Sequence, residues 1–339
     1  MADRPVKFVA LGGVWLDEIR TAGEVTKTDV LGGSVTFATL GARLFAATNT
    51  ASIRLIFFAG HDFPQGHISL FRSWQIALTI HYSDSLPSAR GVIQYDGMDE
   101  SRRTYQRLTA PLPLTWEHLT ISDISNATCF HLFETPEAAA IQVHEVLSRR
   151  TNVADRPIFI WEPQGKSCNT HTLDRHLHAA SLMDVFSPNH AELDSLFEED
   201  ASLIFDRDRV EAQAKYFMDA GVGHGNQGCI VVRCAERGCL IMSQDMAPTW
   251  LPAFYDAGSE HVVDATGGGN AFLGGFSIGY QETGSFIEAA KYGNVAASFA
   301  IEQVGVAKLS VEGEYELWNG QKVRDRLAVY QDGLKSSNE

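Results

Sequence analysis

Three consecutive glycines, Gly267, Gly268 and Gly269, separate an apolar stretch from a predicted helix and constrain the fold more than any other feature. Because glycine has no Cβ atom, the backbone of these residues can turn its N–H groups toward one point. The start of the helix adds unpaired N–H donors and a partial positive charge. This arrangement favours a bound anion, most often a phosphate, and it places Asn270 where the first helical turn meets that anion.

Strand-like and helix-like segments alternate along the chain. Apolar runs typical of buried strands occupy Phe8–Gly12, Ile53–Ala59, Leu78–Tyr82, Cys129–Phe133, Ile158–Trp161, Cys229–Arg233 and Leu240–Ser243. Helices are predicted over residues 35–47, 65–76, 136–150, 171–182 and 211–220, and from Ala271 onward. This alternation predicts an α/β fold with a mainly parallel central sheet and helices on both of its faces.

Two polar segments with scattered β-branched and aromatic residues interrupt this alternation, at residues 15–30 and 90–107. Within the second segment, Val92–Tyr95 and Thr104–Leu108 are predicted to pair as a hairpin. The residues alone leave two interpretations open, since the segments could form a small β lid or two ordinary surface excursions.

The composition limits the kinds of partner. A formal charge of −15 argues against binding to the phosphate backbone of a nucleic acid or to an anionic membrane surface. No segment approaches the ~20 apolar residues of a membrane span. The odd number of cysteines, five, indicates reduced thiols. We therefore expect a cytoplasmic protein with no nucleic-acid partner and no membrane partner.

The glycine run resembles the signature D-[TS]-T-G-A-G-D-A-F of the ribokinase or PfkB family of carbohydrate and nucleoside kinases. The residues that match it are Asp264, Thr266, Gly267, Gly269, Ala271 and Phe272. Asn270 stands where the family places its catalytic aspartate. The resemblance implies a ribokinase-like three-layer fold, with a single domain over residues 1–334, lid segments at about 14–31 and 89–108, and a frayed tail at 335–339.

Further motifs follow in the family's order. Asp17 matches the acidic residue that holds substrate hydroxyls, and Gly32 and Gly33 resemble the double glycine that approaches the sugar. Asn189 and Glu192 match an N-x-x-E motif. In that motif the asparagine lies near the nucleotide phosphates and the glutamate organises a Mg²⁺ ion through water. Each motif also has a structural interpretation, namely a cap or solvated charge, a turn, and a capping box.

Two more residues receive roles from the resemblance. Asn294 lies in a pattern that flanks the nucleotide base, although it could instead satisfy a helix–helix contact. Asp264 corresponds to a ligand of the monovalent cation that some relatives bind beside the glycine loop. In the turn that begins at Arg233, the family's threonine and first glycine are absent. The resemblance therefore implies ATP and Mg²⁺, with a monovalent cation as a further cofactor.

The residue at position 270 decides the expected chemistry. In the family, an aspartate there takes the proton of the attacking hydroxyl, while the Gly267–Gly269 N–H groups stabilise charge on the moving phosphoryl group. A carboxamide is no useful base, and loss of a general base costs about 10²–10⁴ in rate. Phosphoryl transfer depends largely on positioning and electrostatics, so some activity could survive. Because Asn and Asp cap helices about equally well, we expect Asn270 to keep a capping role.

Two functions therefore stay open. The first is an impaired kinase that phosphorylates a hydroxyl of a sugar, a nucleoside or a related small molecule. The second is a nucleotide- or sugar-binding pseudokinase with a regulatory or scaffolding role. A Rossmann-type oxidoreductase is disfavoured, because the G-x-G-x-x-G pattern at 223–228 precedes a predicted strand instead of following one. An exposed β lid could also pair with another copy and form a homodimer.

Overall fold

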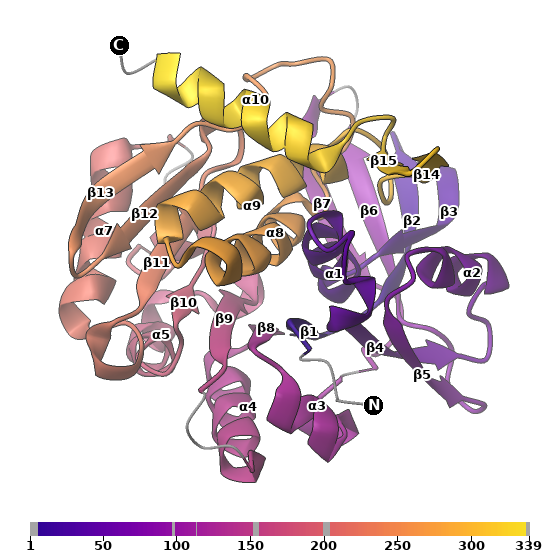
Figure 1. The fold of residues 1–339 in the computed structure, drawn as a ribbon, viewed down its shortest axis with the longest axis horizontal. Coiled ribbons are helices and arrows are strands. Elements are labelled where there is room, and N and C mark those ends of the chain that lie inside the picture. Colours follow the sequence, from indigo (N-terminus) through magenta and orange to yellow (C-terminus); the bar gives the residue numbers. More distant parts are fainter. Residues whose placement is uncertain (1–5, 97–98, 113, 152–155, 199–203, 337–339) are drawn as a thin grey trace.

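The main sheet runs through the middle of the molecule (Figure 1). The computed structural model describes residues 6–96, 99–112, 114–151, 156–198 and 204–336. The strand order in the sheet is β13-β12-β11-β10-β9-β8-β1-β4-β5. These strands are β1 (Phe8–Leu11), β4 (Ile53–Gly60), β5 (Ala77–Ser83), β8 (Cys129–Glu134), β9 (Ile158–Pro163), β10 (Val185–Phe186), β11 (Cys229–Arg233), β12 (Cys239–Ser243) and β13 (Met246–Leu251). The pairing is parallel from β5 to β11, while β12 and β13 add an antiparallel edge.

Helices cover both faces of this sheet. One layer consists of α1 (Ser34–Leu44), α2 (Gln65–Ser73), α8 (Gly268–Thr283), α9 (Phe286–Ile301) and α10 (Val323–Ser336). The other consists of α3 (Ile121–Asn126), α4 (Pro136–Arg149), α5 (Leu173–Ala180), α6 (His190–Ser195) and α7 (Arg207–Ala220). In β1, Phe8 and Ala10 pack into the first layer and Val9 and Leu11 into the second, so the strand is apolar throughout. The predicted three-layer α/β fold with a mainly parallel sheet is confirmed.

A second sheet lies beside the first (Figure 1). Its order is β3-β2-β6-β7, with β2 (Trp15–Thr21), β3 (Glu24–Gly32), β6 (Arg90–Asp96) and β7 (Asp99–Arg107). The predicted hairpin is confirmed, since Ile93 pairs with Tyr105 and Gln94 with Thr104 in antiparallel register. Parallel pairing of β2 with β6 joins the two lid segments. They form one small β lid and not two separate surface excursions.

The strand order reverses at β1, which pairs with β4 on one side and β8 on the other. The next strands of this sheet in the chain, β4 and β5, extend in one direction from β1, and β8 to β11 extend in the other. In sheets of this kind, ligands bind outside the carboxyl ends of the strands at such a reversal. The chain leaves the carboxyl end of β1 and enters lid strand β2, so the lid is attached at this point.

Several sequence expectations need correction or addition. The helix predicted from Ala271 begins three residues earlier at Gly268, because Gly267 takes a left-handed conformation with φ of 79° and serves as the N-cap. The sequence analysis also missed β10, β13 and α3, as well as a small hairpin of β14 (Leu309–Glu312) and β15 (Tyr315–Trp318). Of the tail predicted to fray, residues 335–336 belong to α10 and residues 337–339 lie outside the described residues.

Two further properties concern the whole described chain. The five cysteines are all unpaired and buried, as expected for reduced thiols. Among the described residues, none of the helices combines the length and the apolar character that crossing a membrane requires.

Candidate active site

The glycine run forms the N-terminus of α8, with its N–H groups left uncapped by any side chain of the described residues. Gly267 cannot be replaced without strain, since its φ is positive and a Cβ atom would lie 2.2 Å from the Phe37 ring. The Gly268 N–H donates to the Ala265 carbonyl at 3.3 Å. Apart from this backbone hydrogen bond, the first turn of α8 carries no cap from a described side chain and keeps the partial positive charge that favours an anion.

Asn270 lies in that first turn, but it does not cap the helix as expected. Its Nδ2 atom instead donates to Glu162 Oε2 at 2.5 Å. Glu162 lies near the carboxyl end of β9 and is only 5% exposed. The expectation of a capping role is wrong because the N-cap position belongs to Gly267, and Asn270 lies within reach of the carboxylate beneath the helix.

Arg233 joins the carboxylates at this end of the sheet. Its Nη1 atom donates to Glu162 Oε1 at 2.7 Å, and Nη2 lies 3.5 Å from Glu192 Oε2. The same guanidinium rests on the glycine run, because a Cβ atom on Gly269 would lie 2.2 Å from Nη1. Position 233 is the end of β11, where the resemblance leads one to expect a threonine. A fixed positive charge therefore stands beside the N-terminus of α8.

Glu162 is held as a charged group despite its burial. Burial alone would raise its pKa. Arg233, His131 and the Asn270 amide together outweigh burial and hold the pKa of Glu162 below its ordinary value. The His131 Nε2 atom lies 3.3 Å from Glu162 Oε2. A buried carboxylate with this many donors is ionised at neutral pH.

Asn189 and Glu192 form the capping box that the structural interpretation predicted. Asn189 Oδ1 accepts from the Glu192 N–H, and Glu192 Oε2 accepts from the Asn189 N–H, both at 2.8 Å. Burial raises the pKa of Glu192 to about 7, and repulsion from Glu162 adds to it while Arg233 opposes it. Glu192 is therefore partly protonated near neutral pH.

The fit of this site to Mg²⁺ depends on Glu192. The described residues include no group of three or more His, Cys, Asp or Glu side chains placed to hold a metal ion. Mg²⁺ does not need such a group when it is bound by one or two carboxylates, water and substrate phosphates. Glu192 fits the water-mediated role that the resemblance implies, and its raised pKa means that the cation would also compete with a proton.

Asp17 lies on lid strand β2 and is 4% exposed. Its Oδ1 atom accepts no hydrogen bond from the part of the chain that the structure describes. Burial raises the pKa of Asp17 to about 7, and repulsion from Asp264 contributes to the same shift. A buried carboxylate without a partner is costly, so this oxygen is suited to receive a donor from a ligand, such as a hydroxyl.

The double glycine makes room for the side chains of the lid. A Cβ atom on Gly32 would lie 2.1 Å from Asp17 Oδ2. Gly33 has φ of 94°, and a Cβ atom there would lie 2.3 Å from the Gly13 carbonyl oxygen. Glycine is therefore needed for the lid strand to pack here, which is a reason that sequence analysis did not give.

Asp264 links the lid to the glycine loop. Its Oδ1 atom accepts from the Tyr95 hydroxyl on β6 and from the Thr266 N–H, both at 2.9 Å. Asp264 thereby connects the lid to the loop that leads into α8, close enough to Asp17 for the two carboxylates to repel each other. Its role as a ligand of a monovalent cation stays a prediction.

Asn294 is engaged elsewhere, in the middle of α9. Its Nδ2 atom donates to the Tyr330 hydroxyl at 2.8 Å and to the Pro252 carbonyl at 3.1 Å. Tyr330 belongs to α10, so Asn294 makes the helix–helix contact that was the alternative interpretation. A nucleotide contact by Asn294 stays a prediction.

The predicted residues thus fall into two groups, with Asn294 apart from both. The glycine run, Asn270 and Glu192 meet around Arg233, whereas Asp17 and the double glycine meet beneath the lid beside Asp264. Sequence analysis missed Glu162 and the site role of Arg233. Each stands at the carboxyl end of a predicted parallel strand, and that position alone marks a polar residue as a candidate.

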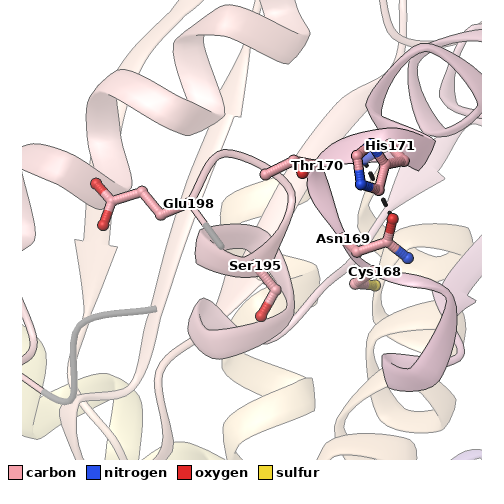
Figure 2. Close-up of a pocket in the computed structure, with 6 residues that line it drawn as sticks. All are labelled: Cys168, Asn169, Thr170, His171, Ser195 and Glu198. Carbon is pink, nitrogen blue, oxygen red and sulfur yellow. Dashed lines mark hydrogen bonds between the residues drawn. The ribbon is translucent and has the colours of Figure 1, made fainter. Parts of the chain in front are cut away.

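A separate hollow of about 280 Å³ opens near α6 and the loop after β9 (Figure 2). It is lined by Cys168, Asn169, Thr170, His171, Ser195 and Glu198. None of these is a predicted site residue. The hollow therefore does not mark the predicted site.

Comparisons with known proteins extend over nearly the whole chain. The profile of the pfkB family carbohydrate kinases matches residues 17–312. An uncharacterised protein of Schizosaccharomyces pombe is 31% identical over 352 residues, covering 98% of this chain and 95% of that protein. Protein MAK32 of Saccharomyces cerevisiae is 29% identical over 344 residues, covering 94% and 91%.

Among solved structures, ribokinase from Giardia lamblia has a similar fold, with a TM-score of 0.68. The match covers 96% of this chain and 99% of that chain at 15% identity. Identity at this level indicates a shared fold and leaves the substrate open. The predicted ribokinase-like fold is confirmed.

Proposed function

This chain belongs to the pfkB family of carbohydrate kinases, and we propose that it transfers the terminal phosphoryl group of ATP to a hydroxyl of a sugar or related small molecule. Members of the family are phosphotransferases with an alcohol group as acceptor. For this chain the acceptor is taken from the same class, a sugar or a nucleoside. We propose that the reaction is slow because position 270 carries an amide.

One observation carries the proposal. The N-terminus of α8 has no capping side chain among the described residues, and the Asp264 carboxylate just before it lies near Asp17, whose Oδ1 atom has no partner there. An anion-binding helix terminus and a hydroxyl-binding carboxylate are the two recognition elements that a carbohydrate kinase requires. Their proximity supports phosphoryl transfer between a nucleotide at Gly267–Gly269 and an alcohol at Asp17.

In the proposed reaction, the acceptor's hydroxyl oxygen attacks the terminal phosphorus of ATP. The bond from that phosphorus to the bridging oxygen breaks, and its electron pair stays on ADP. The hydroxyl proton passes to solvent, because Asn270 offers no basic atom. The Gly269 N–H group and the positive end of α8, together with Arg233, would stabilise charge on the moving phosphoryl group. Mg²⁺, held through water by Glu192, would supply further positive charge.

Other parts of the assignment are proposals of the same kind. Asn189 would lie near the nucleotide phosphates, Asn294 near the base, and Asp264 beside a monovalent cation. Gly32 and Gly33 would bring the backbone close to the acceptor. A homodimer through the lid, a single domain over residues 1–334 and a cytoplasmic location also stay predictions.

A second function is favoured by Arg233. Its guanidinium rests on Gly269 and is already paired with Glu162, so it stands where a terminal phosphate would approach. A protein that keeps this ion pair would bind a sugar or nucleotide without transferring phosphate. The second candidate is therefore a binding protein with a regulatory or scaffolding role.

A phosphotransfer assay over a panel of sugars and nucleosides separates the two functions. The variant Asp17→Asn removes the carboxylate that is proposed to accept a hydrogen bond from the substrate hydroxyl. Calorimetry measures the binding of ATP to the wild type and to this variant. The kinase proposal expects slow turnover of at least one acceptor, reduced about 100-fold in Asp17→Asn, with ATP binding unchanged. Binding of ATP or a sugar without turnover would support the second function. Absence of both binding and turnover would contradict both.

A further inference from the structure

The contact between Asn270 and Glu162 determines which way the amide faces. Glu162 is buried and ionised, and an ionised carboxylate can only accept hydrogen bonds. It therefore selects Nδ2 of Asn270 as its neighbour, at 2.5 Å, because the amide oxygen would be repelled. Since an amide is planar with its oxygen and nitrogen on opposite sides, Oδ1 of Asn270 is directed away from Glu162.

The surroundings fix Glu162 in this role. Its other oxygen accepts from Arg233 at 2.7 Å, and His131 lies 3.3 Å from the oxygen that faces Asn270. The carboxylate is thus held from three sides by side chains of β8, β11 and α8. It cannot turn away from Asn270 without giving up a charge-assisted hydrogen bond.

We propose that Glu162 is a positioning residue that carries the negative charge of a 162/270 pair and holds the Asn270 amide so that its oxygen accepts the hydroxyl of the phosphoryl acceptor. This inference rests on the proposed function. It gives Asn270 a different role, because the amide oxygen then orients the acceptor. The negative charge of the pair lies on the neighbouring side chain of Glu162, on β9. The site lacks a base at position 270 but keeps a hydrogen-bond acceptor there.

A direct consequence concerns the change that would recreate the family's aspartate. In Asn270→Asp a carboxylate oxygen would face Glu162 across the present 2.5 Å contact. Two carboxylates this close cannot both ionise, so the pair would take up a proton near neutral pH. The new carboxyl would then be no better a base than the amide, and the protein would be less stable at high pH.

Exchanging the two groups should remove this conflict. In Asn270→Asp/Glu162→Gln the amide lies on β9 and the carboxylate on α8, with one charge in the pair as before. Glutamine has the length of glutamate, so its Nε2 atom can donate to the new aspartate. Arg233 keeps the Ser187 carbonyl at 2.9 Å and Glu192 as neighbours.

The test compares the wild type, Asn270→Asp, Glu162→Gln and the double variant, with Asn169→Asp as a control. Asn169 is an exposed cap residue whose Oδ1 atom accepts a hydrogen bond, a role that aspartate can fill. We expect Tm of Asn270→Asp to fall by about 5 °C at pH 8 and by less at pH 5.5. The double variant should recover most of that loss, and Asn169→Asp should show none.

Turnover gives the second readout. Asn270→Asp should be no more than about 2-fold faster than the wild type, whereas the double variant should exceed Asn270→Asp by about 10-fold or more. Additive effects on Tm, or a pH-independent Tm loss in Asn270→Asp, would overturn the pairing. A single variant Asn270→Asp that gains 10-fold would overturn the positioning role. If all four proteins are silent toward every acceptor, the proposed function and the hydroxyl contact fail together, and the Tm values still decide the pairing.

Discussion

The two buried carboxylates of the site stand in opposite circumstances. Asp17 beneath the lid has an oxygen with no partner among the described residues, and burial raises its pKa to about 7. Glu162 beneath α8 is equally buried, but Arg233, His131 and Asn270 hold its pKa below the ordinary value. Asp17 and the double glycine form the acceptor side of the site, where one carboxylate oxygen has no partner among the described residues and could be paired by a ligand. The glycine run, Asn270, Glu162 and Arg233 form the transfer side, where the charge of Glu162 is already paired by other side chains of the chain.

The comparison distinguishes Asp17, whose carboxylate has an oxygen left unpaired within the described part of the chain, from Glu162, whose carboxylate is paired by side chains of the same chain. Asp17 and the double glycine resemble the family's pattern, and the Asp17 Oδ1 atom accepts no hydrogen bond among the described residues. On the transfer side, the departures at positions 233 and 270 both contact Glu162. The two departures from the family's pattern are thus joined through one buried carboxylate.

The largest expected effect removes the internal partner of the transfer side. In Arg233→Met, Glu162 and Glu192 lose their shared guanidinium, and breaking a buried ion pair costs about 5 kcal/mol when two carboxylates are left behind. The loss should be greater at pH 8 than at pH 5, because protonation relieves both carboxylates. Urea unfolding at the two pH values measures it.

Arg237→Met is the matched control for this variant. Arg237 lies four residues further on, and its exposed side chain pairs with Glu236. Its loss should change the free energy of unfolding by no more than about 0.5 kcal/mol. If the two variants are equally stable, the transfer side is not held together by Arg233.

The next effect tests the strain at Asp17. Its raised pKa means that the folded protein binds a proton more tightly than the unfolded chain, so stability falls as pH rises from about 4 toward 7. A shift from 3.8 to about 7 corresponds to about 4 kcal/mol over that range. Asp17→Asn should lack this part of the pH dependence. Wild-type and variant curves that run parallel between pH 4.5 and 8 would show that Asp17 has a partner.

A smaller effect tests the packing of the glycine loop. Gly267→Ala adds a Cβ atom 2.2 Å from the Phe37 ring at a φ of 79°. We expect a loss of about 3 kcal/mol from backbone strain and overpacking together. Gly258→Ala is the control, since Gly258 has φ of 77° and no atom within 4 Å of the added Cβ. It should lose about 1 kcal/mol. Equal losses of stability in the two variants would mean that the loop can accommodate the added Cβ atom beside Phe37 without an energetic penalty.

The smallest effect concerns Asn189. Its side chain caps α6, so Asn189→Ala should lower the free energy of unfolding by about 1 kcal/mol. Asn189→Asp, which can accept the same hydrogen bond, should restore this stability. A nucleotide role adds an expectation, since a carboxylate there would repel phosphates and weaken ATP binding even in the stable variant. Unchanged ATP affinity in Asn189→Asp would exclude the nucleotide-binding role and leave Asn189 with the helix-capping role alone.

The sequence predicted the fold well, because apolar runs and helix periods are local signals. The lid hairpin, the three layers and the capping box of Asn189 and Glu192 all follow from short patterns. The Asn270–Glu162 contact could not be predicted, since it joins residues 108 positions apart across two layers. The cap assignment failed for a local reason, because the helix begins at a left-handed glycine and not at Asn270.

The most direct test of the account is a crystal structure with Mg²⁺ and a non-hydrolysable ATP analogue. The account predicts the terminal phosphate at the N–H groups of Gly267–Gly269, beside Arg233, with Asn270 still donating to Glu162. A nucleotide bound elsewhere, or an Arg233 guanidinium that stays on Gly269 and excludes the phosphate, would contradict it.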